Sequence, residues 1–392
     1  MNILITSIVD LKKSQHNRPH QFIKFLSKKH NITVLSINDW WKGGQDDNLG
    51  SYSKDFNELF NRIDYFHLTD KKISPVIQEV FSRNKVNKII EESDFDVHLN
   101  YSTLVSGYFA AKKLKTVYDI ADDLGAMIKE SPQIPSLLKP VGGMFGDIML
   151  KKNIHISSRV TLTTDNLRKT YNIPDHKSEV ISNGVDTNQF RNYGAKAKEE
   201  LGLEGFILGY VGVLREWIDF EPVFSILNEL DNEIKMVIVG KEGRFKETIE
   251  LTKRYGLEDR VKFTGMMPYS QVPKYISAMD ICLMPFSRKS AISESAVPLK
   301  LFEYMACEKP IISTRLNGIE NAAHDKILYA STKEKYKDKI TMLFEDDMLR
   351  EKMGMEGRKF VEENYDWERI AGRMEKIMLG INNNLANKNK DA

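Results

Sequence analysis

The chain has 392 residues with a formal net charge of +2, and 41% of its residues are hydrophobic. Domains of about 100–200 residues are usual, so this length predicts two globular domains. The near-neutral charge gives no electrostatic basis for a nucleic-acid partner. Two cysteines cannot form a disulfide framework, which predicts a cytoplasmic protein. The sequence MNILITSIV at 1–9 is typical of a first strand rather than of a signal peptide.

Predicted strands alternate with predicted helices through the first half of the chain. This alternation indicates a parallel sheet, because parallel strands need a long crossover between them. The strands are expected at 2–9, 32–37, 96–100, 116–120 and 160–163, and the helices at 19–28, 102–114 and 165–171.

The pattern restarts after a turn signal at Asn183 and Gly184, and it predicts a second doubly wound α/β unit. We therefore expect an N-terminal domain over 1–185 and a C-terminal domain over 186–364, followed by a helix over 365–380 and a disordered polar tail over 381–392. In the second unit, strands are expected at 205–211, 234–239, 261–263, 281–285 and 310–314, and helices at 222–230, 245–255, 272–278, 298–306 and through most of 333–379.

The most informative stretch runs from a strand through a polar loop into a helix that opens near Pro298. The first turn of such a helix attracts anions, and Lys300 lies in that turn. Glu303, three residues later, lies on the same face and can accept hydrogen bonds from ribose hydroxyls. The alternative interpretation is an ordinary amphipathic helix with Lys300 and Glu303 as a solvated ion pair.

Several blocks, in order, resemble family 4 retaining glycosyltransferases of GT-B fold. They are PLKLFEYMA at 298–306, KPIIS at 309–313, ISNGVDTNQF at 181–190, YVGVLREW at 210–217, VKFTG at 261–265, MDICLMP at 279–285 and YDW at 365–367. The resemblance implies two Rossmann-like domains that face each other across a cleft, with the last helix returning to the N-terminal domain. It also implies that the N-terminal domain binds the acceptor and the C-terminal domain binds a nucleotide-sugar donor, without a metal or other cofactor.

The resemblance assigns roles to residues of the second domain. Glu303 matches the glutamate that binds the donor ribose, and Val297, Pro298, Leu299 and Lys300 match the segment that holds the diphosphate. Arg215 lies near the family's phosphate-binding arginine, after the loop that contains Gly212.

Two positions depart from the family pattern. The family's other glutamate is replaced by Ser295, with Glu294 beside it, so the catalytic role passes to Glu294 or is absent. A basic residue of the family is replaced by Phe220, so its phosphate contact passes to Lys300 or Lys241. The stretch 216–219 resembles a branch of the family that assembles bacterial surface polysaccharides.

Asp119 and Asp122 lie at or just after the strand predicted at 116–120, where a catalytic group would face the cleft. Either carboxylate could orient the acceptor hydroxyl or take its proton. The alternative is that Asp122 or Asp123 caps a helix. The lone histidines His20 and His98 are expected to be structural, with a functional role as the less favoured alternative.

The segment 137–152 mixes apolar residues with Lys139, Lys151 and Lys152. It predicts either a face that rests on an anionic membrane or a buried helix with solvated lysines. No run of about 18 apolar residues occurs, so no span of a bilayer is expected.

The resemblance implies transfer of a sugar from a nucleotide-diphosphate donor to the hydroxyl of a glycan or lipid-linked acceptor, with retention, in surface polysaccharide or glycolipid assembly at the inner face of the membrane. A nucleotide-sugar epimerase of the same fold and a non-catalytic sugar-binding subunit stay open as alternatives. A nicotinamide-dependent oxidoreductase is disfavoured because no G-x-G-x-x-G follows an early strand.

Overall fold

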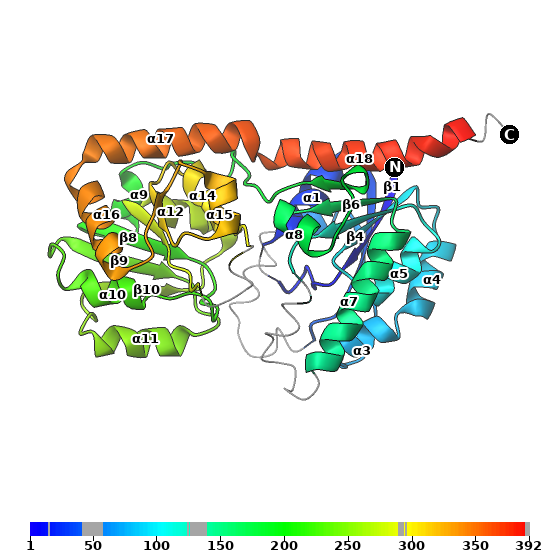
Figure 1. Ribbon diagram of the computed structural model, residues 1–392, viewed down its shortest axis with the longest axis horizontal. Coiled ribbons are helices and arrows are strands. Elements are labelled where there is room, and N and C mark those ends of the chain that lie inside the picture. The colour runs from blue at the N-terminus through cyan, green and yellow to red at the C-terminus, as the bar shows by residue number, and fades with distance from the viewer. Residues whose placement is uncertain are drawn as a thin grey trace. The chain divides into compact units, whose positions relative to one another are not determined.

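The computed structural model describes residues 1–14, 16–40, 58–123, 125, 139–288, 294 and 296–388. They form two compact units (Figure 1). Unit 1 combines Met1–Ser182 with Trp367–Ala392, and unit 2 is the continuous segment Asn183–Asp366. The predicted α/β architecture is confirmed in both units.

Unit 1 contains a seven-stranded parallel sheet in the order β3-β2-β1-β4-β5-β6-β7. Four of the strands, β1, β4, β5 and β6, are almost wholly buried, as expected for parallel strands covered by helices on both faces. The bounds are β1 (Asn2–Ser7), β2 (Asn31–Ser36), β3 (Asp64–His67), β4 (Val97–Tyr101), β5 (Thr116–Ile120), β6 (Arg159–Leu162) and β7 (Ser178–Val180).

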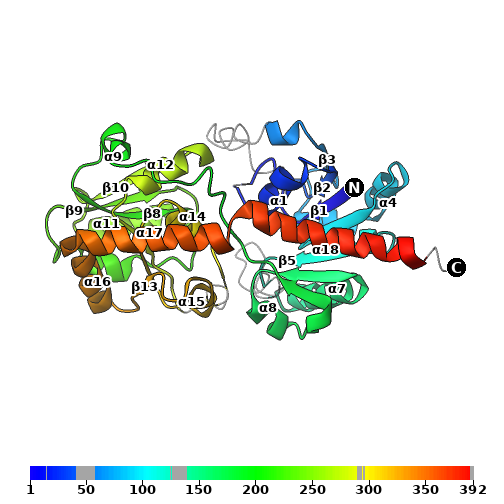
Figure 2. The ribbon, with the colours of Figure 1, turned by 90° about the horizontal axis from the view of Figure 1, so that it is seen from above.

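The last helix of the chain, α18 (Trp367–Lys388), belongs to unit 1 and packs along α1 (Arg18–Leu26), as Figure 2 shows. The rings of Phe22 and Trp367 meet edge to face at 5.5 Å, and both side chains are buried. The other helices of unit 1 are α3 (Pro75–Val80), α4 (Arg83–Glu91), α5 (Val105–Ala111), α7 (Lys139–Ile156), α8 (Asp165–Thr170) and the 3-10 helix η1 (Asp175–Lys177).

Unit 2 contains a six-stranded parallel sheet in the order β10-β9-β8-β11-β12-β13. The strands are β8 (Phe206–Val211), β9 (Ile234–Val239), β10 (Val261–Gly265), β11 (Ile281–Met284), β12 (Ile311–Ser313) and β13 (Leu328–Tyr329). The helices are α9 (Lys196–Glu200), α10 (Glu221–Leu227), α11 (Phe245–Arg254), η2 (Tyr269–Gln271), α12 (Val272–Ser277), α14 (Leu299–Ala306), α15 (Asn317–Ala323), α16 (Lys333–Glu345) and α17 (Asp347–Asn364).

The predicted disorder from residue 381 is wrong for the first part of the tail, because α18 continues to Lys388. Ile381 is buried, and the Lys115 ammonium donates to the backbone oxygens of Ile381 at 2.6 Å and Asn382 at 3.2 Å. These contacts hold the polar segment against unit 1. The predicted disorder of 389–392 lies outside the described residues.

Candidate functional site

The strand order of unit 2 reverses between β8 and β11, which are direct neighbours in the sheet. At such a point the connections leave toward opposite faces and open a crevice beyond the carboxyl ends of the strands, where ligands bind in α/β sheets. The loop after β8 contains Gly212 and Arg215, and the connection after β11 leads into α14. The two predicted donor-binding segments therefore flank one position in unit 2.

Helix α14 begins after Pro298, whose extended backbone places it at the N-cap. The preceding backbone is held from within unit 2, because the Asn183 side-chain amide donates to the Val297 oxygen at 2.9 Å. The first N–H groups of a helix lack partners inside the helix and carry partial positive charge. Leu299 and Lys300 are the first two residues of this helix, so the segment assigned to the diphosphate forms a helix start.

Lys300 connects α14 with the end of β8. Its ammonium donates to the Tyr210 hydroxyl at 2.6 Å and lies 3.9 Å from the centre of the Tyr210 ring. The Tyr210 hydroxyl donates in turn to the Val213 oxygen at 2.9 Å. A Cβ atom on Gly212 would lie 2.7 Å from the Lys300 nitrogen, so a larger residue would displace the ammonium. Lys300 is thus held directly over the Gly212 loop.

Glu303 lies one turn further along α14 and is 8% exposed. Among the described residues its carboxylate receives one hydrogen bond, at 3.3 Å from the Tyr269 hydroxyl. Burial raises the pKa of Glu303 to about 7, against the opposing effects of Lys300 and Tyr269. Burial likewise lowers the pKa of Lys300 to about 7, against the charge of Glu303. A buried carboxylate with one long hydrogen bond retains capacity to accept from a ligand.

Two further glycines fix the path of the Gly212 loop. A Cβ atom on Gly240 would lie 2.2 Å from the Gly212 oxygen, and one on Gly243 would lie 2.2 Å from the Leu214 oxygen. Both glycines have positive φ, at 146° and 79°. The loop after β8 therefore packs directly against the loop after β9, and this contact positions the residue that follows, Arg215.

Arg215 is exposed and lines a pocket of about 600 Å³ together with Arg244 and Lys246. Burial raises the pKa of Tyr210, and the charge of Arg215 opposes this rise. Arg215 therefore lies within electrostatic range of the Tyr210 hydroxyl, to which Lys300 donates. Lys241 is also exposed, in the loop after β9. The donor-binding roles of Arg215 and Lys241 stay predictions.

The remaining predicted residues of this segment have mixed outcomes. Val297 is buried, and Glu294 is partly exposed. Ser295 lies outside the described residues. Ser295 replaces a glutamate of the family, and whether the role of that glutamate passes to Glu294 therefore stays a prediction.

In unit 1, Asp119 is engaged by other side chains of the unit, and its role with the acceptor proton stays a prediction. Its side chain is fully buried and receives two hydrogen bonds from the Arg18 guanidinium, at 2.7 and 2.9 Å. The Thr161 hydroxyl donates a third, at 2.6 Å. Arg18 also donates to the Ser182 oxygen at 2.8 Å. Asp119 therefore anchors α1 and the end of β7 to the centre of the sheet.

Asp122 is exposed in the described structure, and its catalytic role stays a prediction. Asp123 accepts a hydrogen bond from the Tyr171 hydroxyl at 2.7 Å. His20 and His98 are fully buried, and burial lowers the pKa of His98 to about 3. The His98 ring lies at 2.9 Å from two threonine hydroxyls, which is the structural role expected for it.

Sequence reasoning gave no role to Tyr210, Tyr269 or Asn183, although each contacts the predicted donor segment. The positions of Tyr210 close to Gly212, and of Asn183 at the start of unit 2, were visible, but their partners lie far along the chain.

Among the described residues, no group of three or more His, Cys, Asp or Glu side chains is placed to hold a metal ion. In the same part of the chain, every helix is too short or too polar to cross a membrane.

The family described as Glycosyl transferases group 1 matches residues 195–360, which include the Gly212 loop and α14. Residues 195–360 of the chain therefore resemble this family of glycosyltransferases. The resemblance stated from the sequence is therefore confirmed at the level of the family.

Two curated relatives illustrate how far this chain resembles known glycosyltransferases. N-acetyl-alpha-D-glucosaminyl L-malate synthase of Bacillus anthracis is 24% identical over 348 residues, which cover 83% of this chain and 86% of the relative. The putative teichuronic acid biosynthesis glycosyltransferase TuaH of Bacillus subtilis (strain 168) is 30% identical over 146 residues, which cover 36% of this chain and 35% of the relative. The chain spans about half, 53%, of the length of another curated relative.

Solved structures support the fold of the chain over almost its full length. The Anabaena protein Alr3699/HepE, crystallised with UDP-glucose, has a TM-score of 0.72 at 17% identity, covering 97% of this chain and 100% of that one. The GT-B fold, with two Rossmann-like α/β domains, is thereby confirmed.

Proposed function

We propose that the chain transfers a sugar from a nucleoside-diphosphate sugar, bound by unit 2, to a hydroxyl group of an acceptor, with retention of anomeric configuration. The observation that carries the proposal is the arrangement around α14. A helix start, the Lys300 ammonium and the buried Glu303 carboxylate lie together at the point where the strand order of unit 2 reverses.

The proposed roles follow from the charges of the groups. As the bond between sugar and diphosphate breaks, negative charge grows on the leaving diphosphate. The first N–H groups of α14 and the Lys300 ammonium are already in place to stabilise this charge, and preorganised groups of this kind are often the largest catalytic contribution. Glu303, one turn further in, accepts hydrogen bonds from the ribose hydroxyls.

The relatives support a nucleotide-sugar donor and a place in polysaccharide or glycolipid assembly. Alr3699/HepE was crystallised with UDP-glucose, and TuaH is named for teichuronic acid biosynthesis. UDP-glucose is accordingly the first donor to test.

The test measures donor binding and donor use separately. UDP-glucose and other nucleotide sugars are screened for their effect on the melting temperature, since a ligand of the folded state raises it. Glu303→Ala is expected to abolish this shift and donor turnover, whereas Glu258→Ala, at an exposed position of the same unit, retains both. Full donor binding and turnover by Glu303→Ala would refute the site. Conversion of the nucleotide sugar without an acceptor would indicate an epimerase.

We also propose that unit 1 rests on an anionic membrane through α7. Four apolar residues at spacings of three and four form an exposed stripe on this helix, namely Val141, Met144, Phe145 and Ile148. Lys151 and Lys152, at the end of the same helix, are exposed. An apolar stripe with adjacent lysines suits the boundary between lipid tails and anionic headgroups.

Sedimentation with vesicles tests the membrane proposal. Vesicles with anionic lipid are expected to retain the protein more than neutral vesicles do, and Met144→Asp is expected to weaken retention. Met355→Asp is the matched control, because Met355 of α17 is 61% exposed, as Met144 is. Equal retention by neutral and anionic vesicles, or an equal loss in both variants, would contradict the proposal.

A further inference from the structure

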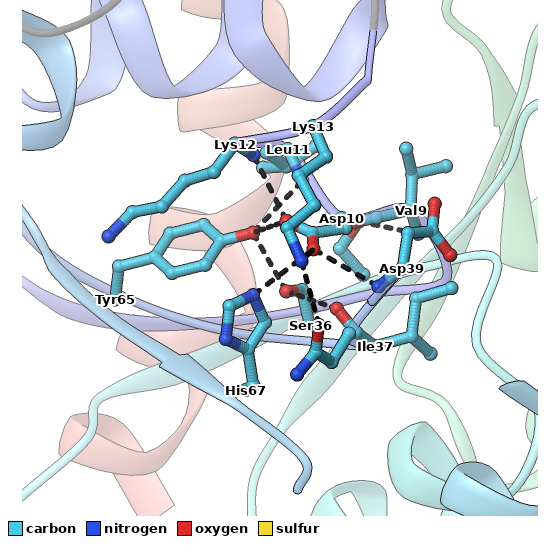
Figure 3. Close-up of polar contacts among 12 residues, drawn as sticks. Val9, Asp10, Leu11, Lys12, Lys13, Ser36, Ile37, Asp39, Tyr65 and His67 are labelled. Carbon is cyan, nitrogen blue, oxygen red and sulfur yellow. Dashed lines mark hydrogen bonds and ion pairs between the residues drawn. The ribbon is translucent and has the colours of Figure 1, made fainter. Parts of the chain in front are cut away.

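A cluster of polar side chains occupies the carboxyl ends of three adjacent strands in unit 1 (Figure 3). Asp10 follows β1, Asp39 follows β2, and His67 ends β3. The strand order of this sheet reverses between β1 and β4, so the loop that holds Asp10 borders the reversal point of unit 1. This is the position at which α/β sheets bind ligands, and none of the roles assigned above uses it.

Asp10 is fully buried and forms the centre of the cluster. Its two oxygens accept from the backbone N–H groups of Lys12 at 3.2 Å and Asp39 at 3.1 Å, and from the Tyr65 hydroxyl at 3.2 Å. His67 Nε2 lies 3.2 Å from Oδ2, and the Lys13 ammonium lies 3.6 Å from it. Three hydrogen bonds and two close side-chain nitrogens thus surround the buried carboxylate, which acts on the groups around it.

The contacts of Asp10 keep it ionised. Burial alone would raise its pKa, but the hydrogen bond and charge of His67, the Asp39 N–H and the charge of Lys13 together lower it. A fixed negative charge inside the cluster holds Lys13 and His67 in place. The Asn38 side-chain oxygen accepts from Lys13 at 2.9 Å and fixes the ammonium from a second side.

The groups that face outward are nitrogen groups. The side chain of Lys13 is 31% exposed and that of His67 is 21% exposed, whereas Asp10 and Asp39 are buried. Figure 3 shows the second ring nitrogen of His67, Nδ1, pointing away from Asp10. Lys12 adds an exposed ammonium, 4.6 Å from the centre of the Tyr65 ring. A ligand that approaches this surface meets donors and positive charge, with the compensating carboxylates covered.

We propose that Lys13 and His67, held by Asp10, bind an acidic group, a carboxylate or a phosphate, of the acceptor in unit 1. This inference rests on the proposed transferase function, since it names the chemical class of the acceptor. The Lys13 ammonium supplies a charge-assisted hydrogen bond. His67 supplies a directional hydrogen bond when its Nδ1 carries a proton. A neutral sugar offers no charge to either group.

The test uses three probes with the full chain: glucuronate, glucose 6-phosphate and neutral glucose. The side-chain NMR signals of the histidines report binding directly, and His67→Gln identifies the His67 signal by its loss. Glucuronate, glucose 6-phosphate or both are expected to shift the His67 signal saturably, whereas glucose does not. The acid with the lower Kd identifies the carboxylate or the phosphate as the preferred group.

Matched variants separate binding from structure. Lys13→Gln and His67→Gln are each expected to weaken binding of the acidic sugar at least about tenfold. The loss of one hydrogen bond to a charged group raises the Kd by about that factor or more. Lys88→Gln and His155→Gln, at exposed positions of the same unit, bind it unchanged. Lys13→Gln retains the His67 ring, so if His67→Gln does not fold, the affinity of Lys13→Gln for the acidic sugar still tests the inference.

Two results would overturn the inference. One is a His67 signal that neither acidic sugar shifts, or that glucose shifts by the same amount as the acidic sugars do. The other is unchanged affinity in both variants. Binding of UDP-glucose and the other nucleotide sugars, measured in parallel, tests the proposed function independently. If the unaltered protein binds none of them, the transferase is refuted, while acid binding at His67 stays measurable.

Discussion

Gly212→Ala tests the contact between the Gly212 loop and α14. The backbone φ of Gly212 is 132°, which residues with a side chain rarely adopt, and the new Cβ would lie 2.7 Å from the Lys300 nitrogen and 3.2 Å from its Cε. The strained backbone is expected to cost about 1–3 kcal/mol of stability. The ammonium must also leave its position beside Tyr210, so the diphosphate loses one charge-assisted contact worth about 1.5–3 kcal/mol. UDP-glucose should therefore bind about 10- to 100-fold more weakly.

Titration calorimetry with UDP-glucose measures the affinity, and urea unfolding measures the stability. Gly256→Ala is the control, because Gly256 also has a positive φ, 62°, but no atom lies within 4 Å of the position that its new Cβ would take. It should lose stability without losing affinity. Donor affinity within twofold of the unaltered protein in Gly212→Ala would refute the role given to Lys300.

Three further predictions concern the buried ion pair, the pH dependence of donor binding and the C-terminal helix. Arg18→Met leaves Asp119 as an unpaired buried charge and should cost about 3–5 kcal/mol in urea unfolding, whereas Arg62→Met, which removes an exposed pair, should cost less than about 1 kcal/mol; equal losses would contradict the structural role of Asp119. Burial lowers the pKa of Lys300 and raises that of Glu303, both to about 7, so a rise in pH from 6 to 8 removes a positive charge and adds a negative one. UDP-glucose affinity should fall across this window, and Lys300→Met should weaken the dependence; affinity that rises with pH would be the opposite result. Lys115→Met removes the contacts to Ile381 and Asn382 and should speed proteolytic cleavage after residue 380, whereas Lys113→Met should not; equal rates in the two variants would show that Lys115 does not hold the segment.

The sequence was sufficient to predict the central strands, because these strands are rich in β-branched and aromatic residues and are almost wholly buried. The strand predicted at 116–120 matches β5, and that at 234–239 matches β9. Edge strand β3 escaped prediction because its four residues, DYFH, are only partly buried and contain two polar side chains. Strand β13 has only two residues, too few to give a pattern.

The site was predictable where its signal is local and unpredictable where a partner is distant. Lys300 and Glu303 belong to one short motif, and the structure brings them to the predicted helix start. Asp119 looked catalytic because it ends a strand, but its partner Arg18 lies 101 residues earlier. The cluster around Asp10 joins residues up to 57 positions apart, from Asp10 to His67, so no single stretch of sequence revealed it.

The discontinuous composition of unit 1 has a consequence for how the protein is made. Unit 2 is one uninterrupted segment and can complete its core as soon as it has left the ribosome. Unit 1 cannot, because the Trp367 ring that covers Phe22 is synthesised after the whole of unit 2. A nascent or truncated chain that ends before α18 keeps an apolar face of α1 open to water, and such chains are the ones that chaperones should retain.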